Sequence, residues 1–147
     1  GASTRLKFLP LVLIGPARCD VGELVAEENV HLLGSRPHGE LPQYLRGLDV
    51  LWLPYVVDDF TRHVYPAKIF ECLALGKPVV STALPSLEAF GEVVRLVEEG
   101  EEHEEALREA LAEDNGELRE RRVALARKNS WEARFGEIRG YVEQLRS

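Results

Sequence analysis

Residues 65–82 read YPAKIFECLALGKPVVST, and this segment decides the fold that we expect for the rest of the chain. Four apolar side chains recur at spacings of three and four and predict a short helix with one buried face: Ile69, Phe70, Leu73 and Ala74. Pro66 suits the first turn of that helix, where a missing N–H costs nothing. Gly76 can adopt the left-handed conformation that ends a helix, and residues 79–82 have the β-branched content of a strand.

Two charged residues, Lys68 and Glu71, lie on the polar side of the predicted helix. They are neighbours because residues three apart share a helix face. This spacing by itself is typical of an exposed ion pair, which contributes little to stability. A charged binding site is the alternative, and it needs support from the surrounding sequence.

The pattern PAKIFECLALGKPVVST, with Thr61-Arg62 a short distance before it, resembles the donor-binding segment of GT-B glycosyltransferases of retaining family 4. The similarity is to the bacterial teichuronic-acid and capsule type, and it extends from about Leu11 to Tyr141. It implies a cytoplasmic enzyme that makes cell-surface polysaccharide or glycan. Such an enzyme transfers a hexosyl group from a nucleotide-diphosphate sugar, without a metal ion or another cofactor.

The composition indicates a folded protein with one domain. Hydrophobic residues make up 45% of the 147 residues, which is enough for a core. The net charge of −7 argues against nucleic-acid binding, which needs a basic face. No apolar run approaches the roughly 20 residues of a membrane span. Cys19 and Cys72 are expected to be small buried hydrophobes in a reduced protein, not a disulfide or a metal site.

Strands alternate with helices along the chain, which predicts an α/β fold. We expect a Rossmann-like three-layer sandwich with a mainly parallel five-stranded sheet and a helical C-terminus. The expected strands are 9–14, buried on both faces, 30–34, 49–54, 79–82 and 93–97. The expected helical segments are 17–28, 39–47, 66–75, 85–91, 101–114, 116–128 and 130–146, the last with Ser130 as its N-cap.

The resemblance also exposes a gap at the start of the chain. Nothing here matches the strand, Gly-rich turn and helix that open the family's donor domain, or the acceptor-binding domain before it. Because methionine is absent as well, we expect residues 1–147 to be one Rossmann-like domain of a longer protein. The usual strand order 3-2-1-4-5-6 puts the unmatched strand at the centre. The other five either close up as 2-1-3-4-5 or leave a slot for another chain, as in a homo-oligomer.

Ligands of parallel α/β sheets bind outside the carboxyl ends of the strands. This rule selects four segments: 15–18, 34–36, 55–68 and 82–86. The resemblance assigns a base-binding turn to Ser35 and Arg36, where Arg36 could stack on a base. Gly15 follows the first strand, and an ordinary strand–helix turn is the alternative there.

The resemblance gives two further roles to residues near the central helix. Glu71 matches the second Glu of the family's Glu-x7-Glu motif, which accepts hydrogen bonds from the ribose hydroxyls. His63 stands where the first Glu of the motif would be, and this departure puts the usual contact with the sugar in doubt. A His could donate to a sugar hydroxyl or a phosphate, and an exposed loop His is the alternative.

Arg62 and Lys68 are the candidates for binding the diphosphate, with Pro66 and Ala67 in the same turn. Free N–H groups and the dipole at a helix start favour an anion. Positive charge there would stabilise the leaving nucleoside diphosphate. Surface cations without a ligand are the alternative, and no residue is assigned as a catalytic group.

Other conspicuous residues are expected to be structural. Trp52 is predicted in the core, His38 and His103 on the surface without partners at metal-ligand spacing, and residues 98–102 as a solvated helix start. Trp131 and the final helix resemble the closing helix of GT-B chains, which packs towards the first domain. An amphipathic helix on the chain's own sheet is the alternative.

Two functions are consistent with the sequence. The first is the nucleotide-sugar donor-binding domain of a retaining glycosyltransferase, which alone would transfer no sugar because the acceptor site lies in another domain. The second is a degenerate glycosyltransferase-like module, fused to another enzyme, that binds a nucleotide sugar or oligomerises. The unmatched opening unit and His63 favour the second function, and the segment 61–82 favours the first.

Overall fold

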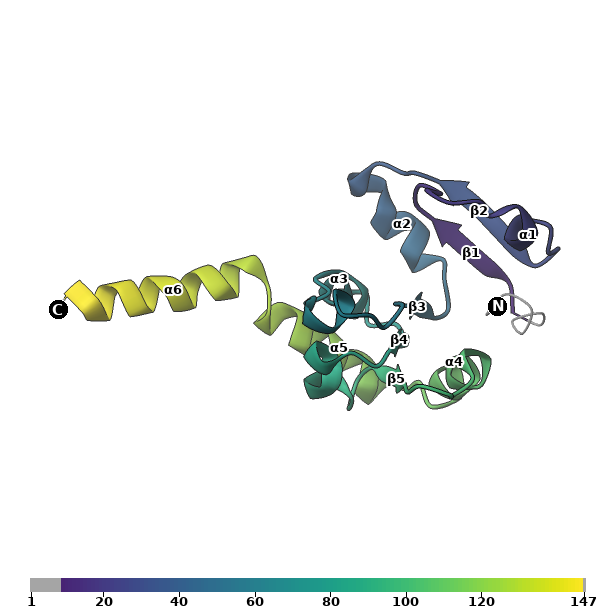
Figure 1. Cartoon of the computed structure of the whole chain (residues 1–147). Helices are drawn as coiled ribbons and strands as arrows, with labels where there is room; N and C mark the ends of the chain where they lie inside the picture. Colours follow the sequence, from purple (N-terminus) through teal and green to yellow (C-terminus); the bar gives the residue numbers. More distant parts are fainter. Residues whose placement is uncertain (1–8, 147) are drawn as a thin grey trace. The chain divides into compact units, whose positions relative to one another are not determined.

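The computed structural model describes residues 9–146. The chain divides into two compact units, Gly1–Gly47 and Leu48–Ser147 (Figure 1). The second unit carries the segment 65–82 and most of the predicted site residues.

The first unit contains a two-stranded parallel sheet. Strand β1 (Leu11–Ile14) pairs with β2 (Val30–Gly34), and α1 (Gly22–Val25) connects them. The short 3-10 turn η2 (His38–Glu40) and helix α2 (Leu41–Arg46) follow. The β1 side chains are half-buried, so the expectation of a strand buried on both faces is wrong.

The second unit is built on a three-stranded parallel sheet. Its strands are β3 (Leu51–Leu53), β4 (Val79–Thr82) and β5 (Arg95–Val97), in the order β3-β4-β5. Trp52 lies opposite Val80 in the first pairing of this sheet. The central strand is completely buried over its first three residues, because it is paired on both edges and covered by helices.

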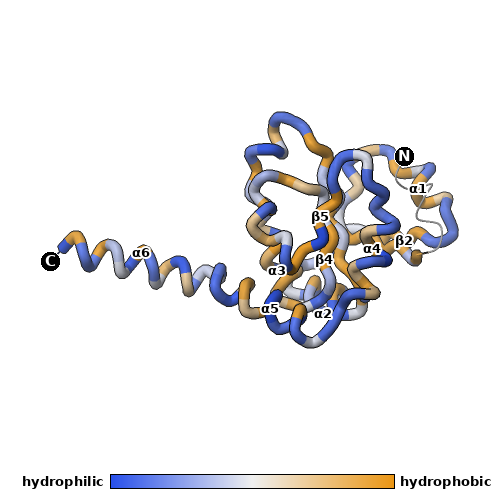
Figure 2. Tube along the Cα trace, turned by 90° about the horizontal axis from the view of Figure 1, so that it is seen from below, coloured by the Kyte–Doolittle hydropathy of each residue, from blue (hydrophilic) through white to orange (hydrophobic). Residues whose placement is uncertain are grey.

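The other elements of the second unit are helices and 3-10 turns: η3 (Thr61–His63), α3 (Lys68–Ala74), η4 (Pro85–Phe90), α4 (His103–Ala112), α5 (Gly116–Lys128) and α6 (Trp131–Arg146). Helix α3 packs against α5, and α4 packs against β4 and β5. Figure 2 shows apolar residues gathered along β4 and β5. Side chains less than 2% exposed include Ile69, Leu73, Leu84, Leu87, Val80 and Val94.

The expected elements are confirmed, and the strands form a parallel sheet within each unit. Order 2-1 is found in the first unit and order 3-4-5 in the second, as predicted. The full order 2-1-3-4-5 stays a prediction.

The final helix α6 begins as predicted, because the Ser130 Oγ accepts a hydrogen bond from the Ala133 N–H at 3.2 Å. None of its residues is buried. Its exposed apolar side chains are Trp131, Phe135, Ile138, Tyr141, Val142 and Leu145. The interpretation of α6 as a helix packed on the chain's own sheet is therefore wrong, and its placement against another domain stays a prediction.

Candidate functional site

The loop that follows β3 carries the predicted residues Arg62 and His63, and hydrogen bonds within the loop shape it. The Thr61 N–H donates to Asp58 Oδ1 at 2.7 Å, and the Asp58 N–H donates to Thr61 Oγ1 at 2.8 Å. The Thr61 hydroxyl also donates to the Val56 carbonyl at 2.6 Å. The donated N–H of Thr61 lowers the pKa of Asp58, so this carboxylate stays ionised and holds the turn η3 closed.

His63 and Arg62 are both exposed in η3. The His63 Nδ1 lies 2.7 Å from the Asp59 carbonyl oxygen. Because a carbonyl can only accept, we infer that Nδ1 carries a proton. The neutral ring then offers Nε2 as an acceptor for a hydroxyl, and only the protonated ring could donate to a phosphate.

The turn that enters α3 is tied to η4. Ser86 Oγ donates to the Val64 carbonyl at 2.9 Å. The first helical N–H groups of the turn, from Ile69 and Phe70, donate to Pro66 and Ala67 at 3.0 and 3.2 Å. Since α3 runs back from the end of β3, its N-terminus lies at the carboxyl edge of the sheet. The predicted site segment therefore lies at the edge where ligands bind in this class of fold.

Lys68 and Glu71 form an ion pair, with 2.9 Å between the Lys68 Nζ and Glu71 Oε2 atoms. Their side chains are 46% and 45% exposed. An exposed ion pair of this kind contributes about 0–1 kcal/mol to stability. Either side chain can therefore leave the pair and contact a ligand at little cost in free energy. Glu71 is therefore not folded into the core, and Lys68 lies beside it.

Two residues near this edge lie in the segments 55–68 and 82–86 selected from the sequence, but no individual role was predicted for them. Tyr55 follows β3 and is half-buried; burial raises its pKa, the Cys72 thiol adds to the rise, and the Lys68 ammonium opposes it. Thr82 ends β4, and its buried hydroxyl has no hydrogen-bond partner among residues 9–146. Their sequence signal is their position at the carboxyl end of a strand.

The other predicted site residues lie in the first unit. The Gly15 N–H donates to the Gly34 carbonyl at 3.0 Å, and Gly15 has a φ of 146°. Ser35 and Arg36 are exposed, and the Arg36 guanidinium lies 5.5 Å from the centre of the Tyr44 ring. Arg62 and His63 in η3 and the Lys68–Glu71 pair in α3 belong to one segment of the second unit. A shared site with the first unit stays a prediction.

Three expectations about individual side chains are wrong. His103 is half-buried and accepts a hydrogen bond at Nδ1 from the Trp52 indole N–H at 3.2 Å. Cys19 is exposed, whereas Cys72 is buried as predicted, and burial raises its pKa to about 11. Ala74 is exposed, because the buried face of α3 is formed by Ile69, Cys72 and Leu73 instead.

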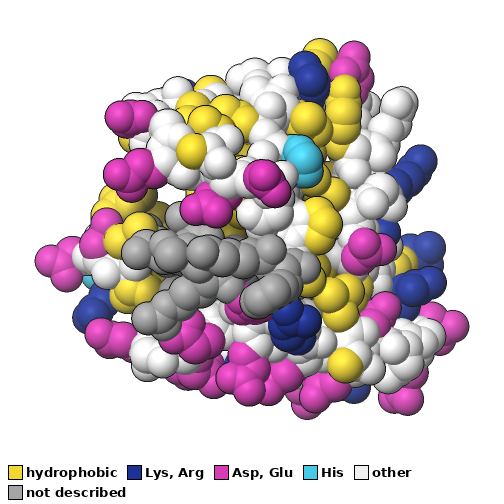
Figure 3. All heavy atoms as spheres, turned by 90° about the vertical axis from the view of Figure 1, so that its right-hand side faces the viewer, with side chains coloured by type: hydrophobic (Ala, Val, Ile, Leu, Met, Phe, Trp, Pro, Cys, Tyr) yellow, Lys and Arg dark blue, Asp and Glu magenta, His cyan; other side chains and the backbone are white. Residues whose placement is uncertain are grey.

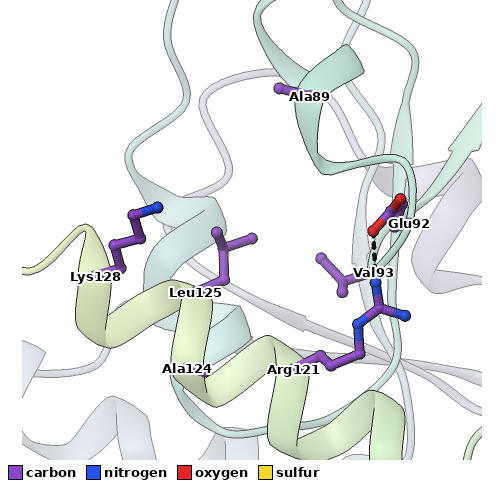
Figure 4. Close-up of a pocket in the computed structure, with 7 residues that line it drawn as sticks. All are labelled: Ala89, Glu92, Val93, Arg121, Ala124, Leu125 and Lys128. Atoms are coloured by element: carbon purple, nitrogen blue, oxygen red, sulfur yellow. Dashed lines mark hydrogen bonds and ion pairs between the residues drawn. The ribbon is translucent and has the colours of Figure 1, made fainter.

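A hollow of about 310 Å³ lies between η4 and α5 (Figure 4). Arg121 of α5 and Glu92 form an ion pair at one end, and Lys128 lies at the other. None of the predicted site residues lines this hollow. Within residues 9–146, no cluster of three or more His, Cys, Asp or Glu residues could hold a metal ion. Figure 3 shows more acidic than basic side chains on one face, in keeping with the net charge of −7.

None of the helices in residues 9–146 is long and apolar enough to cross a membrane. Parallel strands and intervening helices define a Rossmann-like α/β protein. The sequence pattern of the family described as "Glycosyl transferases group 1" matches residues 3–113. The chain belongs to this family.

Two known proteins similar to this chain support the assignment. TuaH of Bacillus subtilis strain 168, which carries the name of a teichuronic acid biosynthesis glycosyltransferase, is 34% identical over 125 residues. That match covers 82% of this chain and 32% of TuaH. The crystal structure of Anabaena Alr3699/HepE in complex with UDP and glucose has a similar fold, with a TM-score of 0.59 and 20% identity over 85% of this chain and 38% of HepE. The chain thus spans about a third of the length of either protein.

Proposed function

We propose that this chain binds the nucleotide-diphosphate sugar donor of a retaining glycosyltransferase that makes cell-surface polysaccharide or glycan in the cytoplasm. The observation that carries the proposal is the exposed Lys68–Glu71 pair at the carboxyl edge of the sheet, inside the segment that resembles the family's donor site. The name of TuaH supports a polysaccharide product. The presence of UDP and glucose in the HepE crystal supports a nucleotide-sugar ligand.

Each charged group has a role in this proposal. Glu71 leaves Lys68 and accepts hydrogen bonds from the two ribose hydroxyls, because a carboxylate offers two acceptor oxygens. Lys68 and Arg62 bind the diphosphate and stabilise the negative charge that grows on it as the sugar leaves. His63 accepts a hydrogen bond from a sugar hydroxyl through Nε2, because Nδ1 is engaged by Asp59.

The transfer itself needs parts that this chain does not supply. In the proposed reaction the acceptor hydroxyl attacks the anomeric carbon on the face that the diphosphate leaves, without a metal ion or a protein nucleophile. The acceptor is held by an N-terminal domain, so positioning is shared between two domains. We expect no sugar transfer by this chain alone, and turnover of a UDP-sugar in a transfer assay would contradict this.

Calorimetric titration with UDP, GDP and ADP tests donor binding. We expect one of them to bind, and Glu71→Ala to weaken that binding about tenfold or more, as loss of a hydrogen bond to a charged group does. Glu92→Ala is the matched control, because Glu92 is likewise an exposed acid in an ion pair, here with Arg121, but lies in the hollow beside α5. Equal affinity of the Glu71→Ala variant and the wild type would refute the assigned site.

A degenerate module for binding or oligomerisation is the second candidate. Two observations favour it: His63 occupies the position of a motif Glu, and α6 exposes its apolar side chains. Under this alternative the folded chain binds none of the three nucleotides. It would instead show a concentration-dependent mass in analytical ultracentrifugation.

A further inference from the structure

Three aromatic rings form a cluster beside the turn that enters α3. The centre of the Tyr65 ring lies 5.9 Å from that of Phe70 and 6.5 Å from that of Phe90. The Phe70 and Phe90 rings meet edge to face, with 5.6 Å between their centres. Such ring pairs stabilise each other beyond simple burial. The cluster therefore links α3, η4 and the residue that precedes Pro66.

Arg134 of α6 lies over this cluster. Its guanidinium carbon is 5.9 Å from the centre of the Tyr65 ring and 5.7 Å from that of Phe70. Both distances are within the range of cation–π attraction, which favours arginine because its planar group stacks on rings. No residue of α6 is buried. The contacts of Arg134 with these two rings therefore join an otherwise exposed helix to the segment 65–82.

The side of α3 that Arg134 contacts, at Phe70, is not the side that carries Lys68 and Glu71. Successive helix residues are rotated by about 100°, so Phe70 points about 160° away from Lys68 and about 100° away from Glu71. Arg134 therefore contacts Tyr65 and Phe70 and not the predicted ligand groups, so any effect on those groups is indirect. Tyr65 is three residues from Lys68, across the turn that contains Pro66 and Ala67.

We infer that Arg134 is a positioning residue of the donor turn, holding residues 65–68 in place by lying across Tyr65 and Phe70. The inference rests on the proposed function for its consequence in ligand binding. The turn belongs to no strand, and its other restraints include the burial of Pro66, the Ser86 hydrogen bond to Val64 and the Ile69 and Phe70 hydrogen bonds to Pro66 and Ala67. Through Arg134, the final helix thereby stabilises the segment that carries Lys68 and Glu71.

Hydrogen exchange of the whole chain tests the inference without any ligand. In an Arg134→Ala variant we expect the Ile69 and Phe70 amides, which bond to Pro66 and Ala67, to exchange faster by about threefold to tenfold. Arg139→Ala is the control, because Arg139 is an exposed arginine on the same helix. Tyr65→Leu should also speed this exchange, and Arg134→Ala should add less in that background than in the wild type, because Arg134 then keeps only its contact with Phe70. Tyr65→Phe should behave like the wild type.

UDP titration of the same variants gives the second readout. If the wild type binds UDP, we expect Arg134→Ala to weaken binding about threefold to tenfold, with partial rescue by Arg134→Lys. Unchanged exchange at Ile69 and Phe70 overturns the inference whatever the affinity. Faster exchange with unchanged UDP affinity shows a structural contact only and also overturns it. A wild type that binds no nucleotide refutes the proposed function, while the exchange data still decide whether Arg134 holds the turn.

Discussion

Arg122 is a buried charged residue of the second unit. It is 4% exposed, and its Nε donates to the Val93 carbonyl while Nη1 donates to the Gly76 carbonyl, each at 3.2 Å. Nη1 also contacts Asp114 Oδ1 at 2.6 Å, and this guanidinium lowers the pKa of Asp114 against the opposing effect of burial. One side chain thus joins the end of α3, the approach to β5 and the loop before α5.

Replacing Arg122 with alanine should destabilise the protein strongly. Two carbonyls and a carboxylate lose their donor, and removing one member of a buried ion pair costs about 3–5 kcal/mol. Urea unfolding measures the change. The neighbouring Arg121→Ala is the control and should cost under about 1 kcal/mol, because the Arg121–Glu92 pair is exposed. Equal effects of the two substitutions would show that the buried contacts are not the cause.

His103 gives the protein a dependence on pH. Burial lowers its pKa from the usual 6.5, with Glu101 opposing, and its neutral Nδ1 accepts the Trp52 N–H. The unfolded chain therefore takes up the proton more readily than the folded one, so this contribution to stability is present above the usual pKa and is lost as pH falls below it.

Thermal unfolding between pH 8 and pH 5 checks this sign. We expect His103→Gln to flatten the decline of the midpoint at the acid end, because the titrating ring is gone. His38→Gln is the control, since His38 is exposed on the first unit. A wild type and a His103→Gln variant with parallel profiles would contradict the prediction.

At the scale of elements, Gly76 decides how α3 joins β4. Its φ is +71°, and a Cβ built there would lie 2.6 Å from the Arg119 Cγ and 3.3 Å from the Val123 Cγ2. Gly76→Ala should therefore destabilise the protein by about 1–3 kcal/mol, through the left-handed backbone and the clash with α5. Gly39→Ala, at a residue with open space and no positive φ, should change the free energy of unfolding little. Chemical denaturation compares the two.

The elements were largely predictable because local signals agree with tertiary packing. Gly76 ends α3 and Ser130 caps α6 as expected from their residue types. What touches an element was not predictable: the clash behind Gly76 comes from α5, and His103 reaches Trp52 from 51 residues away. The spacing of Lys68 and Glu71 predicted their contact. The same spacing does not indicate whether a ligand binds to the two side chains.

The contacts of Arg134 and the exposure of α6 were likewise not predictable from local sequence patterns. The apolar spacing of residues 131–145 is visible in the sequence, yet a period states that a face is apolar and not what covers it. Arg134 contacts Tyr65 and Phe70 although 69 and 64 positions separate them, and no local pattern encodes such a pair. The family was predictable chiefly through the resemblance of residues 61–82, since charge pairs at helical spacing are common without a ligand.

At the scale of the whole molecule, the burial of side chains is unevenly distributed between the two units. The fully buried large side chains all lie in the second unit, from Ile69 to Val97, whereas Val30, at 8% exposed, is the buried apolar residue of the described part of the first unit. A two-stranded sheet with a half-buried face has little independent stability. Free energies of local opening therefore differ between the units.

Native-state hydrogen exchange across the chain should resolve this difference. We expect the amides of β4 to exchange only through global unfolding, and those of β1 and β2 to exchange through a local opening that costs several kcal/mol less. Low concentrations of urea should change the β4 rates steeply and the β1 and β2 rates weakly, because local opening exposes less surface. If both sheets followed one steep dependence, the two units would unfold as a single cooperative body, and the concentration of buried side chains in residues 48–146 would not control stability.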